Sequence, residues 1–244
     1  MMRLIFLFVM LCSFAKAQID SALTVPLIGI NFGAQVPSGD MAKRFGPNLS
    51  LGASFLIKTK KNWVYGTEFS YLFGKNVHED VLKQLKNEGG FVVDNDGFPA
   101  DLRITERGFI GEIVFGRIFK FLSANPNSGL MVNIGVGYMQ HKIHIYDAQQ
   151  RVAAVNGDLK YGYDRLTNGW CMSEFIGYLF LSENRIANFY MGFDFFQGYT
   201  QSLRKLNYDT GSPDTKTRTD LLTGFRIGWI LPLYKKAPNE YYYD

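Results

Sequence analysis

Alternation between bulky apolar residues and small or polar residues is the feature of this sequence that most constrains its fold. From Ile28 to Val36, every even position is apolar, and the odd positions hold Gly, Asn or Gln. A period of two places successive side chains on opposite faces of an extended strand. The same pattern recurs along most of the chain, and the helical period is nearly absent. The sequence therefore predicts an all-β protein.

Eight segments carry the alternation, and each approaches the roughly 10 residues that a tilted strand needs to cross a bilayer. Ile110 and Val114 blur the pattern in the fourth segment, and near Trp170 the phase is ambiguous. There we place the side chains of Phe175, Leu179 and Leu181 outward, because this choice puts Glu174 inside. The eight segments begin near Ile28, Asn48, Trp63, Gly108, Leu130, Trp170, Asn188 and Gly224.

The bulky faces indicate which side of the sheet meets lipid. With 21 Phe and 14 Tyr in 244 residues, the apolar faces are too many for one interior. An eight-stranded barrel leaves room inside for only a few layers of side chains. The bulky set must then face lipid, while Gly, Ser and Asn line the lumen. We predict an eight-stranded antiparallel up-and-down transmembrane β-barrel; its mean hydropathy of -0.07 is low because two opposite faces are averaged.

The connections alternate between short polar turns and long loops. Short turns, such as residues 59–62 and 182–185, normally face the periplasm, and long loops face the outside. In the second long loop, apolar residues between Val77 and Leu85 are spaced as in a short amphipathic helix, which residues 87–90 would end. The four long loops are expected at 37–47, 75–102, 147–168 and 198–220.

The first 17 residues read as a secretory signal peptide. Arg3 precedes an apolar run from Leu4 to Phe14, and Ala15-Lys16-Ala17 forms a small-x-small cleavage site. We expect cleavage before Gln18, a barrel over residues 18–234 and a periplasmic tail over residues 235–244. Only Cys171 remains in the mature chain, which excludes an intramolecular disulfide.

Charge and composition exclude several classes of function. The net charge of +4 is small and its acids and bases are interleaved, so no basic stripe indicates nucleic acid. No later stretch reaches 18 apolar residues, which argues against transmembrane helices. His141 and His144 point to opposite faces of a strand and cannot share a metal. We predict no metal and no cofactor.

Charged residues on the inward faces form the first candidate site. An unpaired charge in a narrow lumen is costly, so we expect a hydrogen-bonded network in which Arg226 bridges two carboxylates. Lys58 lies nearer one end. We interpret the network as a structural plug, with a gated pore or proton path as the alternative. Its predicted members are Glu68, Glu112, Glu174, Asp194 and Arg226.

The long loops and the tail supply candidate contacts with a partner. They combine Tyr and Arg, which are enriched at interface hot spots. The alternative is a set of solvated loops without a partner. The candidate contact residues are Tyr161, Tyr163, Arg165, Tyr199, Arg204, Tyr208, Tyr241, Tyr242 and Tyr243.

The signal peptide, the alternating strands and the large loops resemble those of small OmpA/OmpX-like outer-membrane barrels of the Bacteroidota type. Residues 127–131, 140–143 and 162–169 are similar to segments of a poorly characterised outer-membrane family of that phylum. The resemblance implies a place in the outer membrane of a Gram-negative envelope. It brings no catalytic residues.

From these features we expect a non-enzymatic accessory or scaffold subunit of an envelope protein assembly, with secretion or outer-membrane assembly machinery as one candidate host. The loops or the tail would contact other envelope proteins, and the apolar outer faces of the strands would contact outer-membrane lipid. One alternative is a surface adhesin or ligand-binding barrel. Another is a lipid-modifying enzyme using His141 with Ser173 or Ser202, although no local motif marks a nucleophile.

Overall fold

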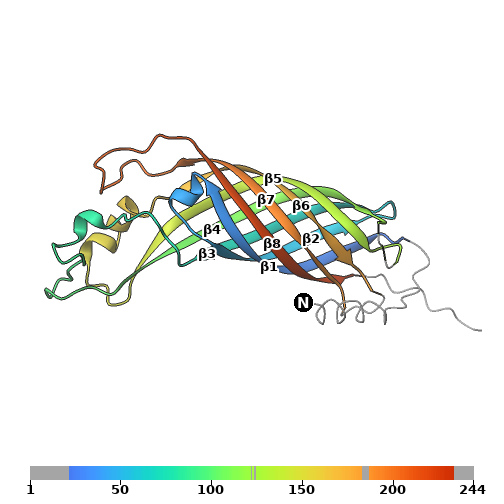
Figure 1. Cartoon of the computed structure of the whole chain (residues 1–244), viewed down its shortest axis with the longest axis horizontal. Coiled ribbons are helices and arrows are strands. Elements are labelled where there is room, and N and C mark those ends of the chain that lie inside the picture. The colour runs from blue at the N-terminus through green and yellow to red at the C-terminus, as the bar shows by residue number, and fades with distance from the viewer. Residues whose placement is uncertain (1–21, 122, 124, 183–186, 234–244) are drawn as a thin grey trace, which may run out of the picture.

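Eight antiparallel strands close into one barrel in the computed structural model (Figure 1), which describes residues 22–121, 123, 125–182 and 187–233. Each strand pairs with the next in sequence, and the last pairs with the first, so the predicted fold is confirmed. The signal peptide and the tail lie outside the described residues. None of the helices described here is long and apolar enough to cross a membrane. The strands are β1 (Val25–Gly39), β2 (Asn48–Lys58), β3 (Trp63–Gly74), β4 (Leu102–Phe119), β5 (Gly129–Asp147), β6 (Thr167–Phe180), β7 (Phe189–Ser202) and β8 (Arg218–Pro232).

The outer surface of the barrel is an apolar belt. On β1 the side chain of Ile30 is 58% exposed, whereas its neighbour Asn31 is 3% exposed and faces the lumen. The same alternation recurs on the other strands, as the sequence predicts. Such a surface would be very costly in water and matches the hydrocarbon of a bilayer. Its large exposed members include Phe32, Leu51, Phe55, Tyr65, Phe69, Ile113, Phe115, Ile134, Val136, Phe193, Phe195, Ile227 and Trp229.

The predicted phase of β6 is wrong. Phe175 is 3% exposed, and Leu179 and Leu181 are fully buried, so these three side chains lie inside. The outward positions are instead the even-numbered ones, and Trp170 is 75% exposed. The lumen has room for the Phe175 ring because the ring lies against Gly177 and Gly192, where an added Cβ would meet it. Glu174 consequently belongs to the outer surface.

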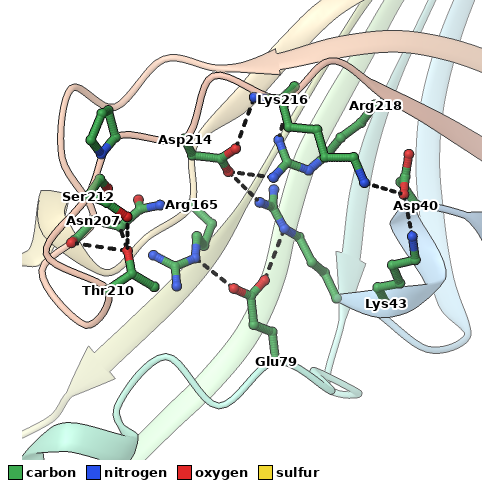
Figure 2. A pocket seen from close by; sticks show the side chains of 12 residues that line it. Asp40, Lys43, Glu79, Arg165, Asn207, Thr210, Ser212, Asp214, Lys216 and Arg218 are labelled. Atoms are coloured by element: carbon green, nitrogen blue, oxygen red, sulfur yellow. Dashed lines mark hydrogen bonds and ion pairs between the residues drawn. The ribbon is translucent and has the colours of Figure 1, made fainter.

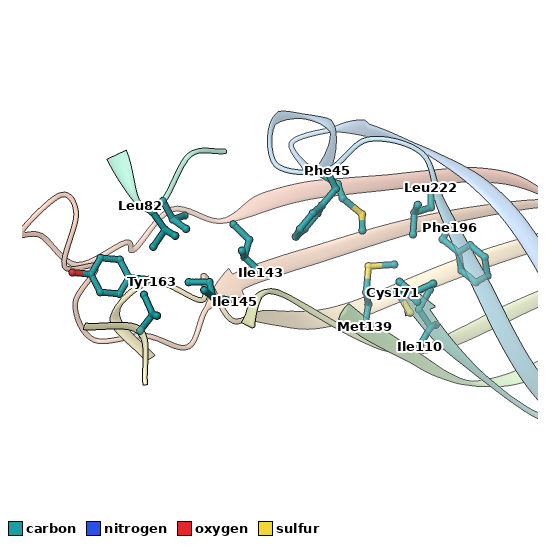
Figure 3. Close-up of a cluster of buried hydrophobic side chains, with 14 of the residues drawn as sticks. Phe45, Leu82, Ile110, Met139, Ile143, Ile145, Tyr163, Cys171, Phe196 and Leu222 are labelled. Atoms are coloured by element: carbon teal, nitrogen blue, oxygen red, sulfur yellow. The ribbon is translucent and has the colours of Figure 1, made fainter. Parts of the chain in front are cut away.

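Apolar clusters lie toward both ends of the interior, and buried polar groups lie between and beside them. One cluster at the short-turn end contains Leu27, Leu56, Phe175 and Tyr190. A second cluster begins in the lumen and continues into the loops, as Figure 3 shows. Bulky apolar side chains therefore line the lumen together with the predicted Gly, Ser and Asn, which corrects the expectation of a lumen lined by small and polar residues. This second cluster, which we call the upper cluster, includes Phe45, Leu82, Ile110, Met139, Ile143, Ile145, Tyr163, Cys171, Phe196 and Leu222.

The long loops pack on one another instead of extending into solvent. The predicted helix at residues 77–86 is wrong, since only a 3-10 turn, Lys83–Leu85, forms there. Val77 forms a β-bridge with Phe45, and the His78 amide donates to the Arg44 carbonyl oxygen (2.7 Å). These contacts hold the segment extended. Its apolar residues Val81 and Leu82 are nevertheless buried, in the upper cluster.

Candidate functional site

Arg226 lies in the middle of the lumen and pairs with two carboxylates. Its Nη1 donates to Glu68, and its Nη2 lies 2.9 Å from Asp194 Oδ1. The register places Arg226 beside Gly33 on β1 and Gly192 on β7, and these glycines leave room for the guanidinium. The guanidinium also lies 4.7 Å from the ring centroid of Phe175. Such bridging and stacking fix one arrangement of the lumen.

Among the described residues, the other predicted members of the network make no ion pair with Arg226. Glu112 is paired in register with Glu68 but accepts its hydrogen bond from Ser173. Glu174 faces outward, where the Gln197 side chain donates to both carboxylate oxygens (3.2 and 3.1 Å). Lys58 is buried at the short-turn end and donates to Asn127 Oδ1 (2.8 Å).

A buried histidine, His141, lies at the long-loop end of the lumen. His141 Nε2 lies 2.8 Å from Asp220 Oδ2, and Thr200 Oγ1 donates to the same oxygen (2.5 Å). Ser173 bonds Glu112, and Ser202 Oγ accepts from the Arg204 amide. Neither serine is hydrogen-bonded to His141, so the pairing of His141 with Ser173 or Ser202 that the enzyme alternative requires does not form among the described residues. They also contain no group of three potential metal ligands.

Ion pairs connect the four long loops above this histidine. Glu79, in the second loop, pairs with Arg44 of the first (3.0 Å) and with Arg165 of the third (2.7 Å). Asp214, in the fourth loop, pairs with Arg44 (3.3 Å) and with Arg218. We call the four joined loops the loop cap. Sequence reasoning missed Arg44, Glu79 and Asp214, because no spacing shows which distant loops meet.

A cleft of about 480 Å³ opens within the loop cap (Figure 2). Five bases and three acids line it. Arg165 is 4% exposed, and its Nη1 has no hydrogen-bond partner among the described residues. A buried donor of this kind can bind an anionic group. The charged lining residues are Asp40, Lys43, Arg44, Glu79, Arg165, Asp214, Lys216 and Arg218.

Burial and pairing shift the pKa values of the loop-cap groups. Burial lowers the pKa of Arg44, although Glu79 partly opposes this effect. Burial alone would raise the pKa of Asp214, but its hydrogen bond and charge interaction with Arg218 lower the pKa overall. The hydrogen bond from Lys43, followed by that from the Thr219 amide, lowers the pKa of Asp40 to about 2. The lowered pKa values of Asp40 and Asp214 keep these two carboxylates ionised at neutral pH.

The candidate contact residues divide into exposed and buried ones. Tyr161, Tyr199 and Tyr208 are 42%, 53% and 42% exposed. Arg204 is partly buried: it holds Asp164 in a two-bond pair (2.7 and 2.5 Å) and stacks on Tyr161. Tyr163 and Arg165 are buried, so they hold the cap together and are not surface contacts. Tyr241, Tyr242 and Tyr243 lie outside the described residues.

Comparisons with known proteins find similarity at the level of architecture. No family model matches the chain, and no curated protein matches it in sequence. Neisserial surface protein A aligns with a TM-score of 0.43 and 7% identity, over 84% of this chain and 96% of its own. The attachment invasion locus protein Ail of Yersinia pestis gives 0.44 and 8%, over 86% and 99%. OprG, an outer-membrane protein of Pseudomonas aeruginosa, gives 0.39 and 13%, over 86% and 97%.

Proposed function

We propose that this chain is a non-enzymatic accessory or scaffold subunit of an envelope assembly, inserted in the outer membrane after removal of a signal peptide before Gln18. Its short turns would face the periplasm and its loop cap the outside. Secretion or outer-membrane assembly machinery is one fitting host. The apolar belt supports membrane insertion, and the filled lumen argues against a transport role.

The observation that carries this proposal is the exposed apolar surface of the loop cap. Ion pairs and the upper cluster hold the four loops together, so these side chains are not free to turn inward. Phe98 is 65% exposed and Leu203 is 50% exposed. Large exposed apolar groups on a preorganised surface are typical of protein contacts. Others on the loops are Phe91, Val93, Leu159, Tyr161, Leu206 and Tyr208.

A polar pair within the apolar belt also supports a subunit role. Glu174 lies between the exposed side chains of Met172 and Ile176, and its carboxylate meets Gln197 of the next strand. Ionisable groups at membrane depth are costly and usually mark a functional contact. We propose that β6 and β7 face another membrane protein there.

The test is gentle detergent purification of the tagged full chain from its native membrane, with mass spectrometry of the proteins that accompany it. The variant Phe98→Ser/Leu159→Ser/Leu203→Ser should recover much less of any loop-cap partner than the unmodified chain. Glu88→Ser, an exposed position on the same long loop as Phe98, is the matched control. A chain that purifies without a stoichiometric partner would refute the subunit proposal, and a triple variant that retains the partner fully would refute the loop cap as the contact surface.

A second candidate function is that of a surface barrel binding an anionic ligand, favoured by the loop-cap cleft and the unpartnered Arg165 Nη1. Lys43 and Lys216 line this cleft with exposed side chains. If the cleft binds anions, inorganic sulfate should shift loop-cap NMR resonances, and Lys43→Gln/Lys216→Gln should weaken the effect. Lys60→Gln/Lys61→Gln, at the opposite end, provides the control. Equal shifts in both variants would contradict an anion site in the cleft.

A further inference from the structure

A second cleft lies at the opposite end of the barrel, at the short-turn end of the β3–β4 pair. Its volume is about 470 Å³. Four of its eight lining residues are basic, and none of the eight is acidic. The bases are Lys60, Lys61, Arg117 and Lys120, and we call this feature the rim cleft.

The rim cleft joins positive charge to the edge of the apolar belt. Arg117 is the register partner of Trp63, and its guanidinium lies 5.0 Å from the Trp63 ring centroid. It also lies 5.7 Å from the Phe119 ring. Trp63 stacks on Phe115, with ring centroids 5.1 Å apart. Cations held against interfacial aromatic rings lie at the depth where lipid headgroups meet acyl chains.

Hydrogen bonds hold the backbone of the rim cleft in place. In the turn between β2 and β3, the Thr59 amide donates a hydrogen bond to the Trp63 carbonyl oxygen (2.8 Å), and Asn62 adopts a positive φ of 61°. The Asn62 carbonyl oxygen accepts from the Ile118 amide (2.8 Å). The turn that carries Lys60 and Lys61 is thus fixed to the strand that carries Arg117. Because the backbone is already fixed, binding a ligand would cost only the conformational entropy of the basic side chains.

We propose that the rim cleft binds the phosphate of a phospholipid in the adjoining leaflet, with the acyl chains lying along Trp63, Phe115 and Phe119. The inference rests on the membrane insertion in the proposed function. Charge complementarity favours this occupant, because four bases without an acid match an anionic phosphodiester. The aromatic wall favours a lipid over a free phosphate ion, since only the lipid covers both parts of the site.

The experiment measures lipid bound to the full chain by native mass spectrometry in a neutral detergent. The probes are phosphatidylglycerol, diacylglycerol with the same acyl chains, and inorganic phosphate as a competitor. We expect one phosphatidylglycerol per chain at much higher occupancy than diacylglycerol, with no displacement by equimolar inorganic phosphate. Each base removed in Lys60→Gln, Arg117→Gln and Lys120→Gln should weaken binding about fivefold.

The charge-matched control is Lys83→Gln, which removes one exposed base at the opposite end, outside both clefts, and should leave phosphatidylglycerol binding unchanged. Equal binding of diacylglycerol would mean that the apolar belt alone binds the lipid. Displacement by inorganic phosphate would indicate a site for soluble anions. An equal loss of lipid binding in the control variant would mean that the overall charge of the protein attracts the lipid. Each of these results overturns the proposal. Insertion into vesicles is measured on the same preparations: failure to insert would refute the membrane function itself, whereas insertion without selectivity refutes only the lipid site.

Discussion

At the scale of single residues, the lumen depends on pairings between residues far apart in the chain. Arg226 and Glu68 are 158 positions apart, yet the barrel brings them into contact. Alternation identifies both as inward-facing, and it predicts a bridge between two carboxylates. It does not identify Asp194 as the second carboxylate, because that depends on the stagger between β7 and β8.

Arg226→Ala should strongly lower the resistance of the barrel to heat. Removing the guanidinium leaves the carboxylates of Glu68 and Asp194 buried without a counter-charge, which costs about 3–5 kcal/mol. The unfolding temperature in detergent at neutral pH, followed by gel mobility of heated samples, measures the loss. Arg107→Ala, at an exposed position of β4, should leave it unchanged. An unaltered unfolding temperature for Arg226→Ala would contradict a stabilising network.

Glu174→Leu should leave the isolated barrel at least as resistant to heat as the unmodified chain. Its side chain meets Gln197 on the outer surface and has no part in the lumen, so the substitution extends the apolar belt. The same unfolding measurement applies, with Glu68→Leu as the comparison that should destabilise. A large loss of stability in Glu174→Leu would mean that Glu174 faces inward after all.

At the scale of elements, strands and loops differ in how far their local sequence determines them. Every strand follows from its alternation, and only β6 required a choice of phase between two faces of similar hydrophobicity. The loops carry no such period. Residues 77–86 have helical spacing, but the bridge from Val77 to Phe45 holds the segment extended. Long-range contacts outweigh a weak local preference there.

Acid should loosen the loop cap before it unfolds the barrel. In the folded cap, hydrogen bonds lower the pKa of Asp40 to about 2, and pairing with Arg218 lowers that of Asp214. A lowered folded-state pKa gives stability that is complete above the unfolded value of about 4 and is lost as the pH falls toward the folded value.

Amide hydrogen exchange, corrected for the intrinsic rate at each pH, measures this effect. Protection of loop amides should stay constant from about pH 7 to 5 and fall between about pH 4 and 2, while strand amides serve as the internal reference. Asp40→Asn should remove part of the pH dependence. Loop protection that rises on acidification would have the wrong sign and would exclude these carboxylates as its source.

At the scale of the whole molecule, the barrel has a filled interior and a cleft at each end. Apolar side chains fill both ends of the lumen, and the ion pairs of Arg226 occupy the middle. The loop cap presents apolar groups and a charged cleft, and the rim cleft presents bases beside aromatic rings. These features support our proposal that the function lies in contacts at the two ends, with the barrel as their rigid support.

The purified barrel should not conduct ions. A filled interior of eight strands offers no continuous water path. Recordings of the full chain in planar lipid bilayers should show the baseline of the empty membrane, with an open porin in the same membranes as the positive control. Reproducible single-channel steps would contradict the plug and revive the gated-pore alternative.

The sequence alone determines that this chain is an antiparallel barrel with an apolar belt, because a period of two is a local property of each strand. It also places Glu68, Glu112, Asp194 and Arg226 on inward faces and indicates where the long loops lie, but it puts Glu174 on the wrong face. The phase of β6, the ion pairs that join the loops and both clefts emerge only in the tertiary structure. Arg44 and Asp214 are 170 positions apart. Their meeting depends on barrel closure, stagger and loop packing, which no local pattern encodes.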